Sequence, residues 1–527
     1  MRLCRECNEN TLWGWCKPCN SKHFKNNFDK WTSGNETIDE FIRNSQLNAN
    51  ERWKVTEWIP YNRFKDVKEI AEGGFSTIYY AKWIDGRIQY WNIKKKRWKR
   101  SKDRFDVVLK KFNNFANLNK EFLNEMAIHL KTMNTASNAI RIYGITKEPE
   151  TNKYMMVLQF MPDGNLRNYL KNHFDNINWN DKLFHLSNLA FSFHKLHTSK
   201  ILHGDFHPGN ILSKNFKNFD FHISDFGLSK IVGQSFENSN RGNIFGVLPY
   251  IAPEVLCGKE YTKAADVYSF GIIAYELITG FAPYYDGPHD RDLALKICNG
   301  LRPKIPFHTP KLITGIIMRC WDARDTHRPT FKELFEELDK IYDNYWENNY
   351  KNNNEITIQI DNAKLFSKNK LKGKFWRLIS NSTPLNYKTH PEAIYTSRLL
   401  NYSDLPKPKN NENFEKELEE ITKSNSFVVE PINMYENFHK NVDGSESFIC
   451  HPILMDIKNV NSNTLENTVL GHVEDLVRVA VPKILEKPIT TNTNRVLNLE
   501  YLRYIALQVK WNPWGQQLSR IRQYSFK

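Results

Sequence analysis

Two short acidic loops carry the residues best suited to chemistry. The first spans residues 203–210 (HGDFHPGN) and places Asp205 and Asn210 five positions apart. At this spacing one loop can present a carboxylate to an acceptor hydroxyl and an amide oxygen to a metal ion. The second loop, residues 224–227 (SDFG), supplies the carboxylate of Asp225. Mg²⁺ prefers oxygen ligands and keeps several waters, so one Asn and one Asp are sufficient protein ligands. The pattern predicts phosphoryl transfer from a magnesium-bound nucleotide.

The two loops resemble the catalytic and magnesium loops of the protein kinase family, H-R-D-L-x-x-x-N and D-F-G. The resemblance implies Asp205 as catalytic base, and Asn210 and Asp225 as magnesium ligands. Gly204 stands where that family carries arginine, which implies an enzyme not switched by phosphorylation of its activation segment. His207 stands where serine/threonine kinases carry a lysine on the transferred phosphate. It is read either as a donor to that phosphate or as a structural histidine.

The lysine that anchors the nucleotide has two candidates, Lys94 and Lys110. Lys94 lies at the more usual distance from Gly73 of the glycine hairpin, whereas Lys110 belongs to the better buried strand. Glu125, which resembles the glutamate of the kinase regulatory helix, follows Lys110 at the normal interval for this ion pair. The expected pair is therefore Lys110 and Glu125, both counted with the catalytic residues.

The resemblance also implies an ATP site between two lobes, under a glycine hairpin that keeps only one of the family's three glycines. The residues expected to contact the nucleotide are Ile70, Ala71, Gly73, Phe75, Ser76, Ile78, Val108, Lys110, Gln159, Met161, Leu212 and Asp225. Farther along, residues 246–254 and 266–271 resemble the end of an activation segment and the helix that follows it. Glu254 and Arg328 are expected to form a buried ion pair.

The expected fold is α+β, a bilobal protein kinase fold. A small antiparallel β lobe with one regulatory helix precedes a larger, mainly α lobe. The expected domains are a Cys-rich zinc segment at 1–22, a linker with a short helix at 23–60, the kinase domain at 61–345 and an Asn/Lys-rich tail at 346–527. The tail is expected to be partly disordered, with amphipathic helices at 413–424 and 498–511.

Half of the eight cysteines form two Cys-x-x-Cys pairs near the start of the chain: Cys4, Cys7, Cys16 and Cys19. Two such pairs can direct four thiolates at one tetrahedral zinc, which closes the site and makes the metal structural. A metal-free cysteine cluster is the alternative. The remaining cysteines are scattered, as is typical of a reducing compartment.

The net charge of +15 suits acidic partners such as nucleotides, but excess charge is more often a solvated surface, so specific nucleic-acid binding is not expected. The basic run at 94–100 is expected as an inserted, solvated loop, with docking to an acidic partner as the alternative. No apolar run is long enough to span a membrane, and the first residues lack a secretion signal. We expect a cytoplasmic location, with the nucleus as the alternative. Oligomeric state is not indicated.

Three functions fit these residues. The first is an ATP-dependent protein kinase of the serine/threonine type, from the tyrosine-kinase-like group suggested by residues 73–76, with protein substrates. The second is a pseudokinase scaffold, favoured by Gly204, His207 and Val247, because valine replaces the threonine that tethers the catalytic loop in serine/threonine kinases. The third is a small-molecule phosphotransferase with a similar H-G-D loop. Those enzymes lack the anchors that Glu254 and Arg328 resemble.

Overall fold

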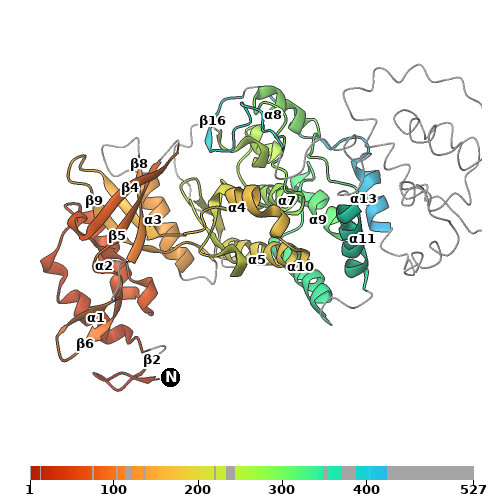
Figure 1. Cartoon of the computed structure of the whole chain (residues 1–527). Coiled ribbons are helices and arrows are strands. Elements are labelled where there is room, and N and C mark those ends of the chain that lie inside the picture. Colours follow the sequence, from red (N-terminus) through yellow and green to blue (C-terminus); the bar gives the residue numbers. More distant parts are fainter. Residues whose placement is uncertain are drawn as a thin grey trace, which may run out of the picture. The chain divides into compact units, whose positions relative to one another are not determined.

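The described part of the chain forms two lobes, one rich in strands and one rich in helices (Figure 1). The computed structural model describes residues 2–11, 14–73, 76–101, 105–112, 120–133, 138–218, 221–232, 244–347, 354–369, 387–402 and 404–423. Both lobes belong to one compact unit that covers residues 1–305, 309–361 and 380–427. The expected α+β bilobal fold is confirmed.

The N-lobe is built on one sheet, in which the described strands follow the order β3–β9–β10–β8–β5–β4. Successive residues of a strand face opposite sides. Val107 and Leu109 therefore pack on one face, and Val108 packs on the other with Phe122 and Met126 of α3 (Lys120–Met133). The strands are β3 (Glu57–Trp58), β4 (Phe64–Glu72), β5 (Ser76–Trp83), β8 (Phe105–Phe112), β9 (Ile142–Lys147) and β10 (Tyr154–Gln159).

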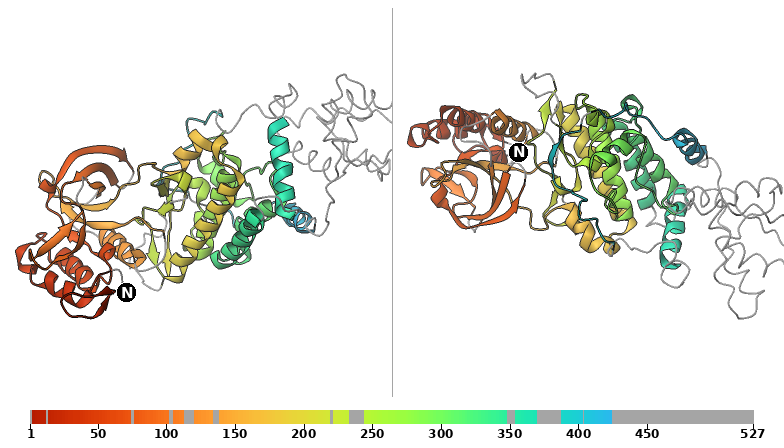
Figure 2. Two further views of the ribbon diagram at one scale, coloured as in Figure 1. Left: turned by 60° about the horizontal axis from the view of Figure 1, so that its bottom comes forward. Right: turned by 90° about the horizontal axis from the view of Figure 1, so that it is seen from above.

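Residues 2–58, the N-terminal module, are packed on this lobe, although residues 23–60 were expected to be a linker. The module contains β1 (Arg2–Leu3), β2 (Asn10–Thr11), α1 (Lys17–Lys25) and α2 (Glu36–Asn48), and it ends in β3. Ile38 and Ile42 of α2 are fully buried in the cluster that includes Phe122 and Met126 of α3. The N-lobe covers the apolar face of α2, so this helix is held in one position on the lobe. The module lies beside the N-lobe strands in both views of Figure 2.

Strand β3 runs parallel to β9 and pairs Glu57 with Gly144. A side chain at Gly144 would collide with this strand, because a Cβ built there lies 2.1 Å from the Glu57 carbonyl oxygen. Arg100 Nη1 donates to Glu57 Oε1 at 3.2 Å, and the Glu57 side chain is only 9% exposed. The absence of a side chain at Gly144 thus leaves room for β3, and the ion pair between Arg100 and Glu57 holds β3 on the sheet.

The basic run at 94–100, expected as a solvated loop, is the turn and second strand of a hairpin formed by β6 (Ile88–Asn92) and β7 (Arg97–Arg100). Lys94, Lys95 and Lys96 are exposed, whereas the side chains of Trp91 and Trp98 contact the N-terminal module. Trp98 stacks on Phe24 with ring centroids 4.3 Å apart, and Trp91 stacks on His23 at 4.0 Å. The hairpin therefore serves as a platform for α1.

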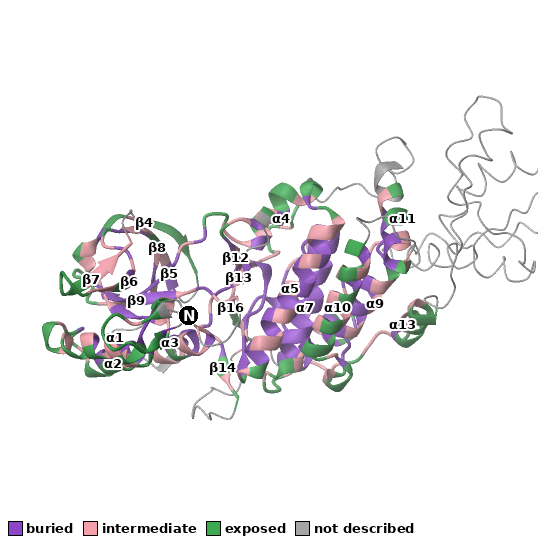
Figure 3. Ribbon diagram, turned by 90° about the horizontal axis from the view of Figure 1, so that it is seen from below, coloured by how far each residue is buried: buried purple, intermediate pink, exposed green. Residues whose placement is uncertain are grey.

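The C-lobe surrounds two helices whose side chains are mostly buried, α5 and α7 (Figure 3). Asn178 caps α5 by accepting from the Asp181 amide at 3.0 Å, and apolar side chains at helical spacing form its inner face. The helices are α4 (Leu166–His173), α5 (Trp179–Thr198), α6 (Pro253–Leu256), α7 (Lys263–Thr279), α8 (Arg291–Cys298), α9 (Lys311–Cys320), α10 (Phe331–Trp346) and α11 (Glu355–Asn369). Short ladders join β11 (Ile201–Leu202) to β14 (Lys230–Ile231) and β12 (Ile211–Ser213) to β13 (Phe221–Ile223).

Residues 387–402, the C-terminal strap, lie on the C-lobe and contain β16 (Arg398–Leu400), which pairs antiparallel with β15 (Ile244–Gly246). The helix expected at 413–424 is confirmed as α13 (Phe414–Lys423), and it buries Phe414 against the C-lobe core. The helix expected at 498–511 lies outside the described residues. Within the described ranges, no helix combines the length and the apolar character needed to cross a bilayer.

Candidate active site

The catalytic loop is anchored from below by Asp266, at the start of α7. The Asp266 carboxylate is fully buried and accepts from the His203 amide at 3.0 Å and from His197 Nε2 at 2.8 Å. Tyr261 donates to it at 2.7 Å. Burial alone would raise the pKa of Asp266, but these hydrogen bonds outweigh burial and hold it below the ordinary value. The motif at 266–271 was expected, but not this role in holding the loop.

His203 is fully buried and joins the two acidic loops. Its Nδ1 accepts from the Asp205 amide at 3.3 Å, so Nε2 carries the proton and donates to the Ser224 carbonyl oxygen at 3.1 Å. Burial lowers the pKa of His203, which keeps the imidazole in the neutral form that these two bonds require. Ser229 donates to the His203 carbonyl oxygen at 2.6 Å.

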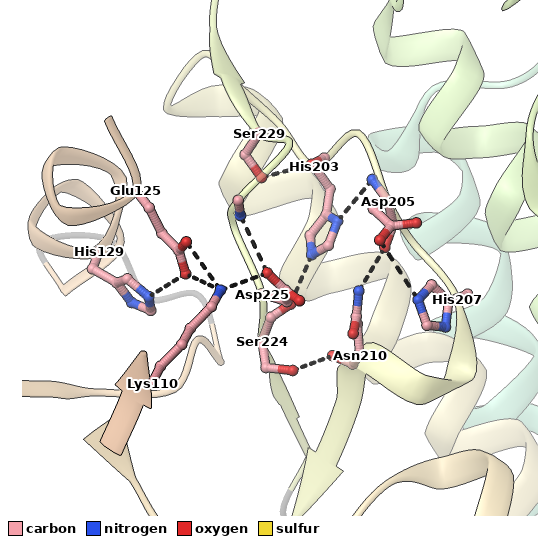
Figure 4. A network of polar contacts seen from close by, with 11 residues as sticks. Lys110, Glu125, His129, His203, Asp205, His207, Asn210, Ser224, Asp225 and Ser229 are labelled. Atoms are coloured by element: carbon pink, nitrogen blue, oxygen red, sulfur yellow. Dashed lines mark hydrogen bonds and ion pairs between the residues drawn. The ribbon is translucent and has the colours of Figure 1, made fainter. Parts of the chain in front are cut away.

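Asp205 lies beside His207, with Oδ2 and Nε2 3.7 Å apart (Figure 4). His207 Nδ1 accepts from the Gly209 amide at 3.1 Å, so the proton of a neutral ring is on Nε2, directed toward Asp205. A Cβ at Gly209 would lie 2.6 Å from the imidazole, so glycine at this position leaves room for the ring. The local geometry gives His207 a defined orientation toward the carboxylate.

Asn210 is oriented by the backbone around it. Its Nδ2 donates to the Asp205 carbonyl oxygen at 2.9 Å, which leaves Oδ1 as the free end of the amide for a metal ion. The Asn210 carbonyl oxygen accepts from the Ser224 amide and hydroxyl, at 2.9 and 3.1 Å. The ladder of β12 and β13 thus fixes Asn210 next to the second acidic loop.

Lys110, Glu125 and Asp225 meet at one point, as Figure 4 shows. Lys110 Nζ lies 2.7 Å from Glu125 Oε1 and 2.8 Å from Asp225 Oδ1. Burial would raise the pKa of Asp225, but the Lys110 charge outweighs it and lowers the pKa to about 2. Burial would also lower the pKa of Lys110, and the two carboxylates raise it instead. Lys110 and Asp225 are therefore both charged at neutral pH.

Two further residues support this cluster and were not predicted. Phe226 is fully buried and packs edge-on against His129 of α3, with ring centroids 5.1 Å apart. His129 Nε2 lies 3.7 Å from Glu125 Oε1. The only sequence signal was the helical spacing of four between Glu125 and His129. Phe226 therefore couples the D-F-G loop to the helix that carries Glu125.

Apart from Asp225, the described residues expected to surround the nucleotide lie on β4, β5, β8, β10 and β12 and in the turns that follow β4 and β10. Ile70 and Ala71 are exposed on β4, Ser76 and Ile78 lie on β5, and Gly73 donates its amide to the Ser76 carbonyl oxygen at 2.8 Å. Val108, Leu212 and Met161 join the cluster that continues under α3, and Gln159 ends β10. Phe75 lies outside the described residues.

Gly204 and Val247 depart from the kinase pattern for reasons visible in the structure. Gly204 has φ of +83°, and a Cβ there would lie 2.5 Å from the Leu228 carbonyl oxygen, so arginine would strain this backbone. Val247 is 1% exposed and packs in the C-lobe core. The loop is held by Asp266 and His203 instead of by a hydroxyl at position 247.

The family model described as protein tyrosine and serine/threonine kinase matches residues 64–338. The chain belongs to the protein kinase family. A probable serine/threonine-protein kinase, roco5 of Dictyostelium discoideum, is 30% identical over 286 residues, which are 52% of this chain and 9% of that protein. Ankyrin repeat and protein kinase domain-containing protein 1 of Mus musculus is 32% identical over 281 residues, covering 50% and 34%. A putative serine/threonine-protein kinase/receptor, R826 of Acanthamoeba polyphaga mimivirus, is 27% identical over 299 residues, covering 54% and 16%. The chain thus spans about a third or less of these relatives.

The kinase domain contains the buried ion pair predicted between Glu254 and Arg328. Arg328 Nη1 and Nη2 each lie 2.7 Å from a Glu254 carboxylate oxygen, and both side chains are buried. Arg328 also donates to the carbonyl oxygens of Asp322 and Ala264, at 2.8 and 2.9 Å. The prediction is confirmed, and the pair fixes the end of the activation segment to the C-lobe of the kinase.

Ahead of the kinase domain, the Sγ atoms of Cys4, Cys7, Cys16 and Cys19 all lie within 4.8 Å of one another. Cys4 and Cys19 are 3.8 Å apart, and Cys7 and Cys16 are 3.6 Å apart. Four sulfurs at about 2.3 Å from a tetrahedral zinc would be separated by about 3.8 Å, so the cluster fits zinc. Cys16 is the N-cap of α1, so the cluster also fixes the start of that helix.

Proposed function

We propose that this chain is an ATP-dependent protein kinase that transfers the γ-phosphoryl group of Mg-ATP to Ser or Thr hydroxyls of proteins. The observation that carries this proposal is the meeting of Lys110, Glu125 and Asp225 at 2.7 and 2.8 Å. Phosphoryl transfer depends mainly on positioning and on charge stabilisation, and this cluster supplies both. The Ser/Thr preference rests on the names of the relatives.

Each side chain has a distinct role in this proposal. Lys110, held by Glu125, binds the α- and β-phosphates, and Asp205 orients the acceptor hydroxyl and accepts its proton. Asn210 and Asp225 would hold Mg²⁺, which neutralises phosphate charge when bound. Asp225 suits this role because it is ionised, and Asn210 because its amide oxygen is left free by the bond to the Asp205 backbone.

His207 has a positioning role in the same proposal. Its Nε2 proton faces Asp205 across 3.7 Å, close enough to orient the carboxylate when the acceptor arrives. In other serine/threonine kinases a lysine at this position contacts the transferred phosphate directly, whereas His207 would act through Asp205.

The purified 527-residue chain tests the proposal with Mg-[γ-³²P]ATP and dephosphorylated casein, and mass spectrometry identifies the modified residues. Asp225→Ala should lose nearly all transfer, and Asp205→Asn should lose about 10²–10⁴-fold because a positioned base is removed. Asp343→Ala, an exposed carboxylate of α10, is the matched control and should retain the wild-type rate. Equal labelling by the wild type and Asp225→Ala would favour the pseudokinase scaffold, for which Gly204 and Val247 are the supporting departures.

We include in the proposal a structural zinc held by Cys4, Cys7, Cys16 and Cys19. Four thiolates close the coordination sphere, so the ion would stabilise the N-terminal module and take no part in transfer. Protein substrates and a cytoplasmic location remain part of the proposal.

A further inference from the structure

The edge of β15 lies next to the catalytic carboxylate. Gly246, the last residue of β15, has φ of +141°, and a Cβ built on it lies 3.3 Å from Asp205 Oδ1. Any side chain at position 246 would therefore contact Asp205, so the end of β15 lies directly beside this carboxylate. A protein acceptor must bring its own backbone to the same place, because the hydroxyl of a Ser or Thr is only two bonds from the main chain.

That edge already carries a strand of this chain. Strand β16 pairs antiparallel with β15, with Leu400 opposite Ile244 and Arg398 opposite Gly246. An extended peptide commonly binds by adding a strand to an exposed sheet edge, where main-chain hydrogen bonds supply affinity for many sequences. One edge of β15 cannot pair with β16 and with an acceptor at the same time.

Residues just before β16 and within it hold the strap on the C-lobe. The Arg167 guanidinium lies 4.3 Å from the centre of the Tyr395 ring, and Tyr395 donates to the Pro283 carbonyl oxygen at 2.9 Å. His289 Nδ1 lies 2.9 Å from the Ile394 carbonyl oxygen, and Arg398 donates to the His289 carbonyl oxygen. Leu400 is 2% exposed, so its side chain is inserted into the C-lobe core.

We propose that residues 390–402 occupy the edge at which a protein acceptor docks, and that the strap inhibits the kinase by competing with extended Ser/Thr-containing polypeptides. This inference rests on the proposed function. The strap does not take part in the ion pairs expected to bind the nucleotide. Among the described residues, Lys110 pairs with Glu125 of α3 and with Asp225 of the D-F-G loop. The strap therefore raises the KM for the acceptor and leaves the KM for ATP unchanged.

Two neighbouring leucines provide a matched pair of variants in the 527-residue chain. Leu400→Asp places a carboxylate in the core and releases the strap, whereas Leu399→Asp changes a side chain that is 43% exposed. With Mg-ATP and casein, Leu400→Asp should lower the casein KM at least fivefold, with the ATP KM within twofold of wild type. Leu399→Asp should match the wild type. A casein KM that is unchanged or raised in folded Leu400→Asp protein overturns the proposal.

A binding measurement tests the strap without relying on phosphoryl transfer. A fluorescein-labelled peptide of residues 390–402 should bind Leu400→Asp, by anisotropy, at least tenfold more tightly than the wild type, whose own strap fills the edge. Absence of binding to a folded, strap-released chain overturns the proposal. Tyr395→Ala, which removes the Arg167 contact from outside the core, replaces Leu400→Asp if circular dichroism shows the latter to be unfolded. If no variant labels casein, the kinase assignment is refuted. The peptide-binding measurement would still show whether the strap occupies the edge of β15.

Discussion

The N-terminal module and the C-terminal strap both lie outside residues 64–338, yet they attach to the kinase domain in different ways. The module buries Ile38 and Ile42 completely, adds β3 to the N-lobe sheet and carries four clustered cysteines. The strap is held by main-chain pairing with β15, by polar contacts around His289 and by the buried side chain of Leu400. Its Leu399 side chain is 43% exposed in the middle of β16.

The difference indicates different roles for the two attachments. Apolar burial attaches the module to α3, the helix that carries Glu125, and the proposed zinc would hold the start of α1, so the module is expected to support the surroundings of Glu125. A strand held on a sheet edge competes with any extended polypeptide of suitable fit. The N-terminal module thus stabilises the regulatory helix α3, whereas the C-terminal strap occupies the edge of β15 at which we propose that an acceptor docks.

The largest effect is expected from loss of the cysteine cluster. Cys16→Ser with Cys19→Ser removes two zinc ligands and the fixed start of α1, so the module should unfold and the casein rate should fall more than tenfold. Zinc content by atomic emission should fall from about one per chain to near zero. Cys450→Ser, at a cysteine that belongs to neither Cys-x-x-Cys pair, is the control. Full activity in a double variant that lacks zinc would contradict the supporting role of the module.

The next effect tests whether α2 stabilises α3. Ile42→Ala removes a fully buried side chain from the cluster shared with Met126 and should lower the free energy of unfolding by about 2–5 kcal/mol. Ile93→Ala, at a position 43% exposed, should change it by less than about 0.5 kcal/mol. Urea unfolding followed by tryptophan fluorescence measures both. Equal effects of the two variants would mean that α2 is not seated on the lobe.

A smaller effect is expected where β3 joins the sheet. Gly144→Ala places a Cβ against the Glu57 carbonyl oxygen and should displace β3, at a cost of about 1–3 kcal/mol. Hydrogen exchange should become faster for the amides of β3 while those of β16 stay unchanged. At Gly287 a Cβ meets nothing within 4 Å, so Gly287→Ala is the control. Faster exchange in both attachments would show that they are not independent.

A pH-dependent effect is expected from Lys182 of α5, in the C-lobe body. Burial lowers the pKa of this amine to about 7, whereas an exposed lysine titrates near 10.5. Between these values the unfolded chain binds more protons than the folded one, so stability should rise with pH from 7 to 10. Lys182→Met removes this pH dependence, so the wild type should gain stability relative to the variant as pH rises from 7 to 10. The same slope is expected in the Leu400→Asp background; a flat difference would contradict the burial of a neutral amine.

Much of the candidate site could be predicted because its residues lie close together in the sequence. Asp205 and Asn210 share one loop, and the spacing between Lys110 and Glu125 follows from a strand leading into a helix. The contact of Lys110 with Asp225, 115 positions later, was expected only through the family resemblance. The predicted pair of Glu254 and Arg328 was correct for the same reason.

The amino-acid sequence by itself determined the clustering of the cysteines and the spacing of the charged residues, because both are local. The bilobal fold was predicted through the resemblance of the ordered motifs to the protein kinase family. Only the tertiary structure decided that residues 23–60 are a packed module, that Asp266 and His203 hold the catalytic loop, and that β16 lies on β15. Strand pairing and burial join distant segments through backbone groups that every residue carries, so no local pattern in the sequence specifies those partners.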